Sequence, residues 1–479
     1  MTTGVSSNLV SDKPTSAASS VIPDRASAEA LDLAPTANPG AFLEGNFAPV
    51  DREHSLFDLP VEGELPQDLE GLLLRDGPNP IGAVSAKHHW FVGDGMLHAV
   101  ELRAGRAAYR NRWVRTERAA QALGEPAAPT SPHATALQGS GAVHVVAHGG
   151  RILALGEVGL PYAMDRELRT LGQHDFAGAL RSSMTAHPKL DPVSGELVFF
   201  GYDFGPVHLR YHVADATGAL TRTLEIETPR PTMMHDFGVT RSRVVFMDLP
   251  VVFDLDLVAQ GYALPFRWDD AHPAQLGVMA REGGAVQWIE IEPCYVFHPL
   301  NAYDDGERIV MDVVRYRRTF DIARRGESEA GALVRWTIDP AAASVRTELL
   351  DDRGQEFPRV DPRRECLPHR FGYALETTPE RGRFAFGGLI KHDLVRGTRE
   401  HHDVGPGRSA SEPVFVPRGP AEDEGYVLAT VYDAARDGSD VIVLDAQRFA
   451  AAPLATIHLP VRIPFGFHGN FVPRAFPLS

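Results

Sequence analysis

Four histidines occupy similar surroundings although they lie far apart along the chain. They are His187 in MTAHPKLDP, His235 in TMMHDFGVT, His298 in CYVFHPLNA and His468 in PFGFHGNFV. Each follows apolar or threonine residues and directly precedes Pro, Asp or Gly, so each imidazole is expected at a strand end in an apolar setting. Burial favours the neutral imidazole, which is the form that binds metal ions.

Any one of these histidines, taken alone, is explained more simply as a structural residue. The intervals between them, 48 to 170 residues, are too long for one helix face or one metal knuckle. The four can converge only if the chain passes the same axis repeatedly, as the inner strands of a β-propeller do. Imidazole ligands suit iron, zinc or copper, whereas a calcium site would favour oxygen ligands. The histidines therefore suggest a transition-metal site and a propeller together.

Short strand-like segments would have to position these side chains. From about residue 42 onward, runs such as GRILALGEV, GELVFFGYDF, SRVVFMDLP, ERIVMDVVRY and GYVLATVYD alternate with turn residues. The best helix candidates are short and lie near 116–123 and 254–261. Because strands and helices do not alternate, the pattern argues against a parallel α/β sheet. The pattern predicts an all-β protein, either a propeller or a large sandwich, although WD and kelch repeats are absent from the sequence.

Composition narrows the function classes. The chain has 479 residues, 43% of them hydrophobic and 23% charged, which is typical of a soluble globular protein. A net charge of −16 argues against nucleic acid as a partner. Two cysteines, Cys294 and Cys366, are too few for a disulfide framework and favour a reducing cytoplasm. Residues 1–40 lack the basic and apolar segments of a signal peptide and predict a flexible tail.

Longer motifs around the histidines resemble a known family. SSMTAHPKLDPVSGELVFFGYDF, MMHDFGVTRSRVVFMDLP, YVFHPLNAYDDG and PFGFHGN are similar to signatures of the carotenoid cleavage oxygenases, in the same order along the chain. Supporting matches are LLLRDGPNP, HHWFVGDGMLH, RILALGEVGLPY, GQEFPRVDPR and SEPVFVPR. The resemblance extends over residues 42–475.

This resemblance implies a seven-bladed β-propeller, with residues 41–479 as one catalytic domain and a cap of loops and short helices over the active-site face. It implies one Fe(II) per chain on the axis, bound by His187, His235, His298 and His468. It also implies three glutamates behind these ligands, at the matching positions Glu157, Glu356 and Glu412. Ligating histidines usually donate their second ring N–H to a carboxylate or carbonyl. We expect Glu157 to hold His235, Glu356 to hold His298 and Glu412 to hold His468.

His187 is then left without a carboxylate partner. Lys189, two residues further on, is expected to be a solvated charge at a strand edge.

The implied reaction is cleavage of a C=C bond with O2 to give two carbonyl products, without a side chain acting as general acid or base. Family members that cleave stilbenes or phenylpropenes often carry a lysine where this chain has Gly156, so a carotenoid or apocarotenoid is favoured here. Tyr109 or Lys87 could replace that lysine, which keeps a stilbene or isoeugenol-like substrate open. The third alternative is a non-catalytic propeller that binds an apolar ligand.

Residues 248–270 carry several large apolar side chains and few cations. In the resembling family, the equivalent region lines an apolar entrance for lipid-dissolved substrates. An exposed apolar patch there would allow peripheral contact with the inner face of the membrane. A buried connection between blades explains the same residues equally well.

Overall fold

The computed structural model describes Met1 and residues 40–478, apart from 86–87, 134–136, 204–206, 229, 261, 263, 322–328 and 381–382. The predicted flexible tail falls on residues 2–39, which lie outside the described residues. The domain boundary near residue 40 stays a prediction.

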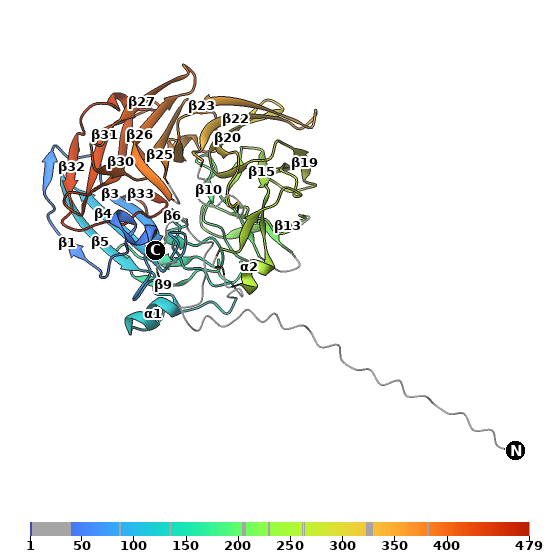
Figure 1. Ribbon diagram of the computed structural model, residues 1–479, viewed down its shortest axis with the longest axis horizontal. Coiled ribbons are helices and arrows are strands. Elements are labelled where there is room, and N and C mark those ends of the chain that lie inside the picture. Colours follow the sequence, from blue (N-terminus) through green and yellow to red (C-terminus); the bar gives the residue numbers. More distant parts are fainter. Residues whose placement is uncertain are drawn as a thin grey trace.

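Seven antiparallel sheets are arranged in a ring (Figure 1). This arrangement confirms the predicted all-β class and the seven-bladed propeller, and it excludes the sandwich. Each sheet has one end strand at the central axis, and the next strands run outward. In chain order the axial strands are β6 (His144–His148), β10 (Lys189–Leu190), β14 (Phe237–Val239), β20 (Tyr295–Asp305), β24 (Gln355–Arg359), β29 (Val414–Pro417) and β33 (Gly469–Pro473).

The remaining strands complete the blades. Beyond β6 lie β7 (Arg151–Leu155), β8 (Tyr162–Met164) and β9 (Thr170–Gln173); beyond β10, β11 (Leu197–Tyr202), β12 (Leu209–Ala214) and β13 (Leu220–Ile226); beyond β14, β15 (Arg243–Asp248), β18 (Gln275–Ala280) and β19 (Gln287–Glu290). Beyond β20 lie β21 (Arg308–Tyr316), β22 (Ala332–Asp339) and β23 (Ser344–Asp351); beyond β24, β25 (Phe371–Glu380), β26 (Arg383–Asp393) and β27 (Thr398–His402).

The two ends of the described chain close the ring. The first blade contains β1 (Ser55–Leu56), β5 (Arg106–Trp113), β4 (Gly95–Arg103) and β3 (Gly71–Pro78), and β3 pairs with the C-terminal strand β33. The last blade contains β28 (Arg408–Ala410), β30 (Gly425–Asp433), β31 (Gly438–Asp445) and β32 (Ala455–His458), and β32 pairs with the N-terminal strand β2 (Val61–Gly63). Both closures join residues about 400 apart in the chain, so the complete ring needs both ends of the described chain.

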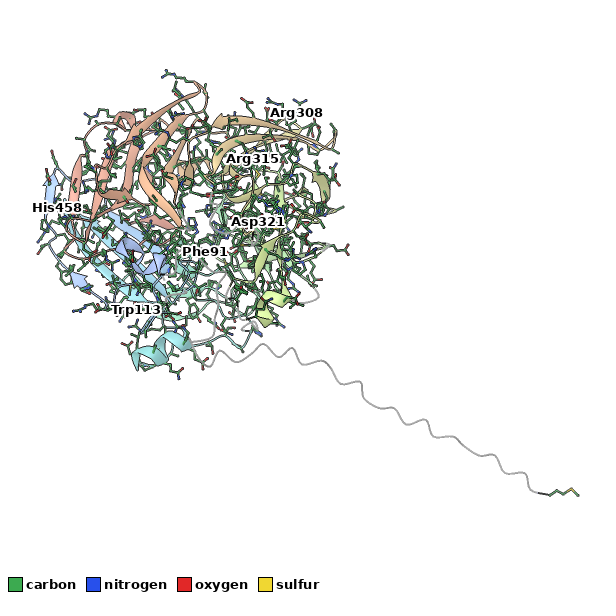
Figure 2. All side chains as sticks on the ribbon, in the orientation of Figure 1. Phe91, Trp113, Arg308, Arg315, Asp321 and His458 are labelled. Atoms are coloured by element: carbon green, nitrogen blue, oxygen red, sulfur yellow. The ribbon has the colours of Figure 1, made fainter. Side chains whose placement is uncertain are left out.

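Short elements outside the blades cover one face of the ring. They include the 3-10 helices Ala41–Leu43 and Gly45–Phe47, helix α2 (Leu255–Ala259) and the strand pair β16 (Val251–Phe253) and β17 (Phe266–Trp268). Helix α1 (Glu117–Leu123) and α2 confirm the two predicted helix positions, and a further 3-10 turn spans each of Pro362–Arg364 and Ala446–Arg448. Figure 2 shows Phe91 near the centre of the ring and His458 at its rim.

Within the described residues, the helices are too short and too polar to cross a membrane. Cys294 and Cys366 are both buried and free.

Glycine permits close packing behind one histidine motif. Gly201 lies in β11 against the backbone of Ser183, and a Cβ atom on Gly201 would overlap the Ser183 carbonyl. The segment from Ser183 leads directly to His187. The close approach of β11 therefore helps to set the path of that segment.

We expect Gly201→Ala to destabilise the fold by about 1–3 kcal/mol, because the added methyl group overpacks a closed site. Urea denaturation followed by circular dichroism measures this change. Gly438→Ala is the control, since its Cβ would lie no closer than 3.3 Å to any atom beyond its chain neighbours. Equal stability of the two variants would contradict the proposed packing role.

Candidate metal centre

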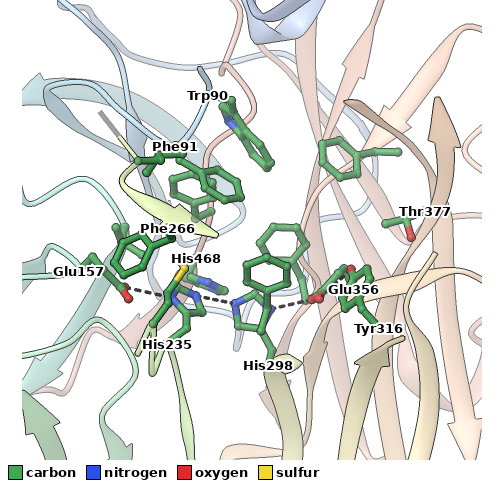
Figure 3. Close-up of a pocket in the computed structure, with 17 residues that line it drawn as sticks. Trp90, Phe91, Glu157, His235, Phe266, His298, Tyr316, Glu356, Thr377 and His468 are labelled. Atoms are coloured by element: carbon green, nitrogen blue, oxygen red, sulfur yellow. Dashed lines mark hydrogen bonds and ion pairs between the residues drawn. The ribbon is translucent and has the colours of Figure 1, made fainter. Parts of the chain in front are cut away.

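The axial strands bring the four predicted histidines together. His187 and His235 lie two residues before β10 and β14, His298 lies within β20, and His468 directly precedes β33. Their ligand nitrogens all lie within 4.8 Å of one another. Figure 3 shows His235, His298 and His468 converging on one point.

The distances between the rings fit a shared metal ion. Nε2 of His235 lies 3.0 Å from Nε2 of His187 and 3.3 Å from Nε2 of His298. Imidazole nitrogens bound side by side at about 2.1 Å from one metal would lie about 3 Å apart. Four neutral nitrogen ligands suit a first-row transition metal such as iron, zinc or copper.

Three of the histidines contact glutamates through their other nitrogen. Nδ1 of His235 lies 3.0 Å from Glu157 Oε2, Nδ1 of His298 lies 2.6 Å from Glu356 Oε2, and Nδ1 of His468 lies 2.8 Å from Glu412 Oε1. The structure thus places each glutamate beside the histidine expected from the sequence. A carboxylate at Nδ1 keeps the proton there and leaves the Nε2 lone pair directed at the centre.

Tyrosine hydroxyls, which the sequence analysis did not identify, hold two of these glutamates. Tyr202 donates to Glu157 Oε1 at 2.8 Å, and Tyr316 donates to Glu356 Oε1 at 3.0 Å. Burial and the adjacent carboxylates raise the pKa of both tyrosines, so the hydroxyls stay protonated as donors. Tyr202 lies in the quoted strand GELVFFGYDF, but neither tyrosine stands beside a histidine in the sequence.

Glu356 and Glu412 also accept hydrogen bonds from the backbone. The N–H of Phe357 donates to Glu356 at 2.7 Å, and the N–H of Gly469 donates to Glu412 at 2.7 Å. A register shift between Glu356 and Arg359 marks a bulge in β24, and Phe357 there has a φ of 53°. A bulky residue rarely adopts this left-handed conformation, which costs about 1–3 kcal/mol and must be stabilised by its surroundings.

His187 has a different environment. The nearest carboxylate oxygen, Asp236 Oδ2, lies 3.5 Å from His187 Nδ1, which is too long for a good hydrogen bond. Asp236 is instead bound to Lys189, whose Nζ lies 2.8 Å from Asp236 Oδ1. The expectation of a solvated Lys189 was wrong: only 16% of its side chain is exposed, because the fold places the buried Asp236 beside it.

A fifth histidine contacts the backbone that carries His187. Nδ1 of His144 donates to the Ala186 carbonyl at 2.6 Å, and Asn470 Nδ2 donates to His144 Nε2 at 3.0 Å. Asn470 also donates to the Val145 carbonyl at 2.8 Å. This connection joins β6, β33 and the segment before β10.

Burial favours the neutral form of two of the four rings. It lowers the pKa of His187 and His468 well below the usual value for histidine, and the neighbouring imidazoles lower it further. Burial also disfavours the charged form of His235, but Glu157 and two more distant carboxylates outweigh it and raise the pKa of that ring. Neutral rings present nitrogen lone pairs that can bind a metal ion, and the nearby carboxylates can balance part of its positive charge.

An apolar cavity borders the histidines on the capped face. We call it the aromatic cavity because of the side chains that line it. Its lining includes Trp90, Phe91, Phe266, Phe297, Phe357, Phe386 and Phe467, together with Val143, Met233 and Leu264. Within the described part of the chain, its lining contains neither Lys nor Arg. Tyr109 is not at this cavity but is buried in β5, where its hydroxyl pairs with His98 at 2.8 Å, and Lys87 lies outside the described residues.

We predict that His187→Ala removes bound metal but leaves a folded protein, because the remaining three rings hold the metal less well and the β structure does not depend on this side chain. Metal analysis by mass spectrometry and circular dichroism measure the two properties. Unchanged metal content would contradict the assignment of His187 as a ligand.

We predict that Glu356→Gln weakens metal binding by about 10- to 100-fold, since the amide cannot stabilise the His298 ring as the carboxylate does. Competition with a chelator measures the affinity. Glu376→Gln is the matched control, because Glu376 contacts His401 at 3.0 Å away from the centre. An equal effect of both variants would show that the loss is not specific to the centre.

Known proteins share this architecture. The family model described as retinal pigment epithelial membrane protein, RPE65, matches residues 47–473. A carotenoid cleavage oxygenase of Mycobacterium tuberculosis is 41% identical over 90% of this chain and 97% of its own length. The lignostilbene dioxygenase structure from Pseudomonas brassicacearum superposes with a TM-score of 0.82 at 30% identity, covering 90% of this chain and 98% of that one.

A cobalt-substituted apocarotenoid oxygenase from Synechocystis superposes with a TM-score of 0.80 at 29% identity, covering 89% of this chain and 97% of that one. The match of the family model spans most of this chain, and the Mycobacterium relative matches nearly end to end. The chain therefore belongs to the RPE65 family of carotenoid cleavage oxygenases and is an oxidoreductase.

Proposed function

We propose that this protein is a non-haem Fe(II)-dependent dioxygenase that cleaves a C=C bond of a carotenoid or apocarotenoid with O2. The two oxygen atoms of O2 end in two carbonyl products, an aldehyde or ketone from each half of the substrate. The observation that carries the proposal is an aromatic cavity that directly borders three of the four converging histidines, His235, His298 and His468.

The residues at the centre fit iron. His187, His235, His298 and His468 would hold it, and the Nδ1 contacts of three of them favour the ligating tautomer. When bound, Fe(II) supplies the O2 chemistry that the side chains themselves lack.

The chain contributes orientation and exclusion of water. Phe297 and Phe357 lie close to the His298 ring, at centroid distances of 6.1 and 5.5 Å, so a flat conjugated substrate would be held between aromatic faces beside the histidines. Two polar groups at the cavity wall are already engaged, since Tyr316 donates to Glu356 and Trp90 Nε1 donates to the Phe465 carbonyl at 2.7 Å, whereas the Thr377 hydroxyl has no hydrogen-bond partner among the described residues. An apolar polyene needs no further hydrogen bond from such a wall.

The absence of cations from the described cavity lining supports a polyene over a phenolic substrate. A 4-hydroxyphenyl group that enters this lining would lose hydrogen bonds to water, which costs about 1–3 kcal/mol when a buried polar group stays unpaired. The similarity to a lignostilbene dioxygenase favours the second candidate, cleavage of a stilbene or phenylpropene.

Substrate access is proposed through residues 248–270. Leu264 and Phe266 of this segment line the aromatic cavity, and Leu255 on α2 is 73% exposed. The segment is therefore more than a connection between blades. Peripheral contact with the inner face of the membrane, and location in the cytoplasm, stay predictions.

We expect the iron-loaded protein to cleave a carotenoid or apocarotenal with a kcat/KM at least ~10-fold above that for 4-hydroxystilbene or a 4-hydroxyphenylpropene, which corresponds to about 1.4 kcal/mol. Mass spectrometry of the carbonyl products identifies the scissile bond. The His298→Ala variant is the inactive control. Faster cleavage of the phenolic substrates would replace the first candidate with the second, and cleavage of neither class would favour a non-catalytic binding protein.

A further inference from the structure

A second cavity reaches the histidines along the propeller axis. This axial cavity is lined from the axial strands, or from residues directly before them, in all seven blades. His187 borders the axial cavity and His235 borders the aromatic cavity, while His298 and His468 border both. The four histidines therefore stand between two cavities of different chemistry.

Charged side chains line the axial cavity. Lys189 is matched by Asp236, and Arg359 Nη1 lies 3.5 Å from Glu412 Oε1. Glu365 is a third carboxylate in this lining, and its Oε2 accepts the backbone N–H of Leu190 at 3.2 Å. Among the described residues, no lysine or arginine forms an ion pair with Glu365. The lining therefore carries one carboxylate more than its cations balance.

Glu365 is half-buried and lies beside the exposed end of the axial cavity. Its hydrogen-bond partner Leu190 is 38% exposed, and Pro362 and Pro473 of the same lining are also exposed. A cation that arrives from solvent would meet the Glu365 carboxylate first and the histidines afterwards.

We propose that the axial cavity is the route by which a divalent metal ion reaches the four histidines. This inference rests on the proposed metal centre. A metal ion without a counter-ion loses its hydration energy when it enters an apolar environment, and contacts with aromatic side chains compensate for only a small part of that loss. The aromatic cavity therefore opposes passage of the ion. A carboxylate-lined cleft instead raises the local concentration of cations and their rate of association.

Charge reversal at the mouth tests the route. Metal-free protein is mixed with Co²⁺, and the visible absorption of the bound ion is followed with time. Glu365→Lys is expected to slow uptake about 10-fold at low ionic strength, and the difference should shrink as salt screens the charge. Glu292→Lys, at a side chain that is 90% exposed outside the cavity, is the matched control and should take up Co²⁺ at the parent rate.

Narrowing each cavity provides a second test that does not depend on charge. Val146→Phe narrows the axial cavity from β6, and Leu264→Phe narrows the aromatic cavity. Slower Co²⁺ uptake is expected only for Val146→Phe, with the final Co²⁺ content and the circular dichroism spectrum of the parent. Leu264→Phe should change the KM of the substrate instead.

Two outcomes would overturn the inference. One is equal uptake by Glu365→Lys and Glu292→Lys, and the other is slower uptake in Leu264→Phe than in Val146→Phe. A parent protein that binds no Co²⁺ at all would instead refute the metal centre itself. The two failures are therefore distinguishable without measuring catalysis.

Discussion

Imidazole lone pairs that face one another across the propeller axis are the central constraint on this structure. The Nε2 atoms of His187 and His298 lie 3.0 and 3.3 Å from that of His235. Carboxylates at Nδ1 of His235 and His298 hold the proton there, so their Nε2 lone pairs face that of His187 and repel one another unless a cation lies between them. Burial strengthens this requirement at His187 and His468, because it disfavours the protonated form of those two rings.

The supporting groups reduce the freedom of each ring in a different way. Glu157 depends on the Tyr202 hydroxyl, Glu356 on Tyr316 and a backbone N–H, and Glu412 on the N–H of Gly469. Hydrogen-bonded carboxylates of this kind fix the orientation of a ligand before metal arrives, so less conformational entropy is lost on binding. The segment of His187 is restrained through its backbone, by the contact of Ala186 with His144.

The four histidines also separate an apolar cavity from a charged one. Aromatic side chains on the capped face favour an apolar substrate and exclude water, whereas ion-paired side chains line the axis. Phe357 borders both cavities and packs against the rings of His298 and His468 at 5.5 and 5.3 Å. Phe357 has a left-handed backbone conformation at the bulge in β24. At this bulge, Glu356 contacts His298 while the adjacent Phe357 side chain forms part of the wall of both cavities.

Local sequence determined the all-β class, the two short helices and the motifs around the histidines, because alternating apolar residues and turn residues act within a few positions of the chain. The resemblance of those motifs supplied the propeller and the pairing of histidines with glutamates. Only the tertiary structure decided the surroundings of Lys189, the tyrosines behind the glutamates, the contact of His144 and the two cavities. These depend on contacts between blades, such as that of Asn470 in β33 with His144 in β6, which join positions that no local pattern connects.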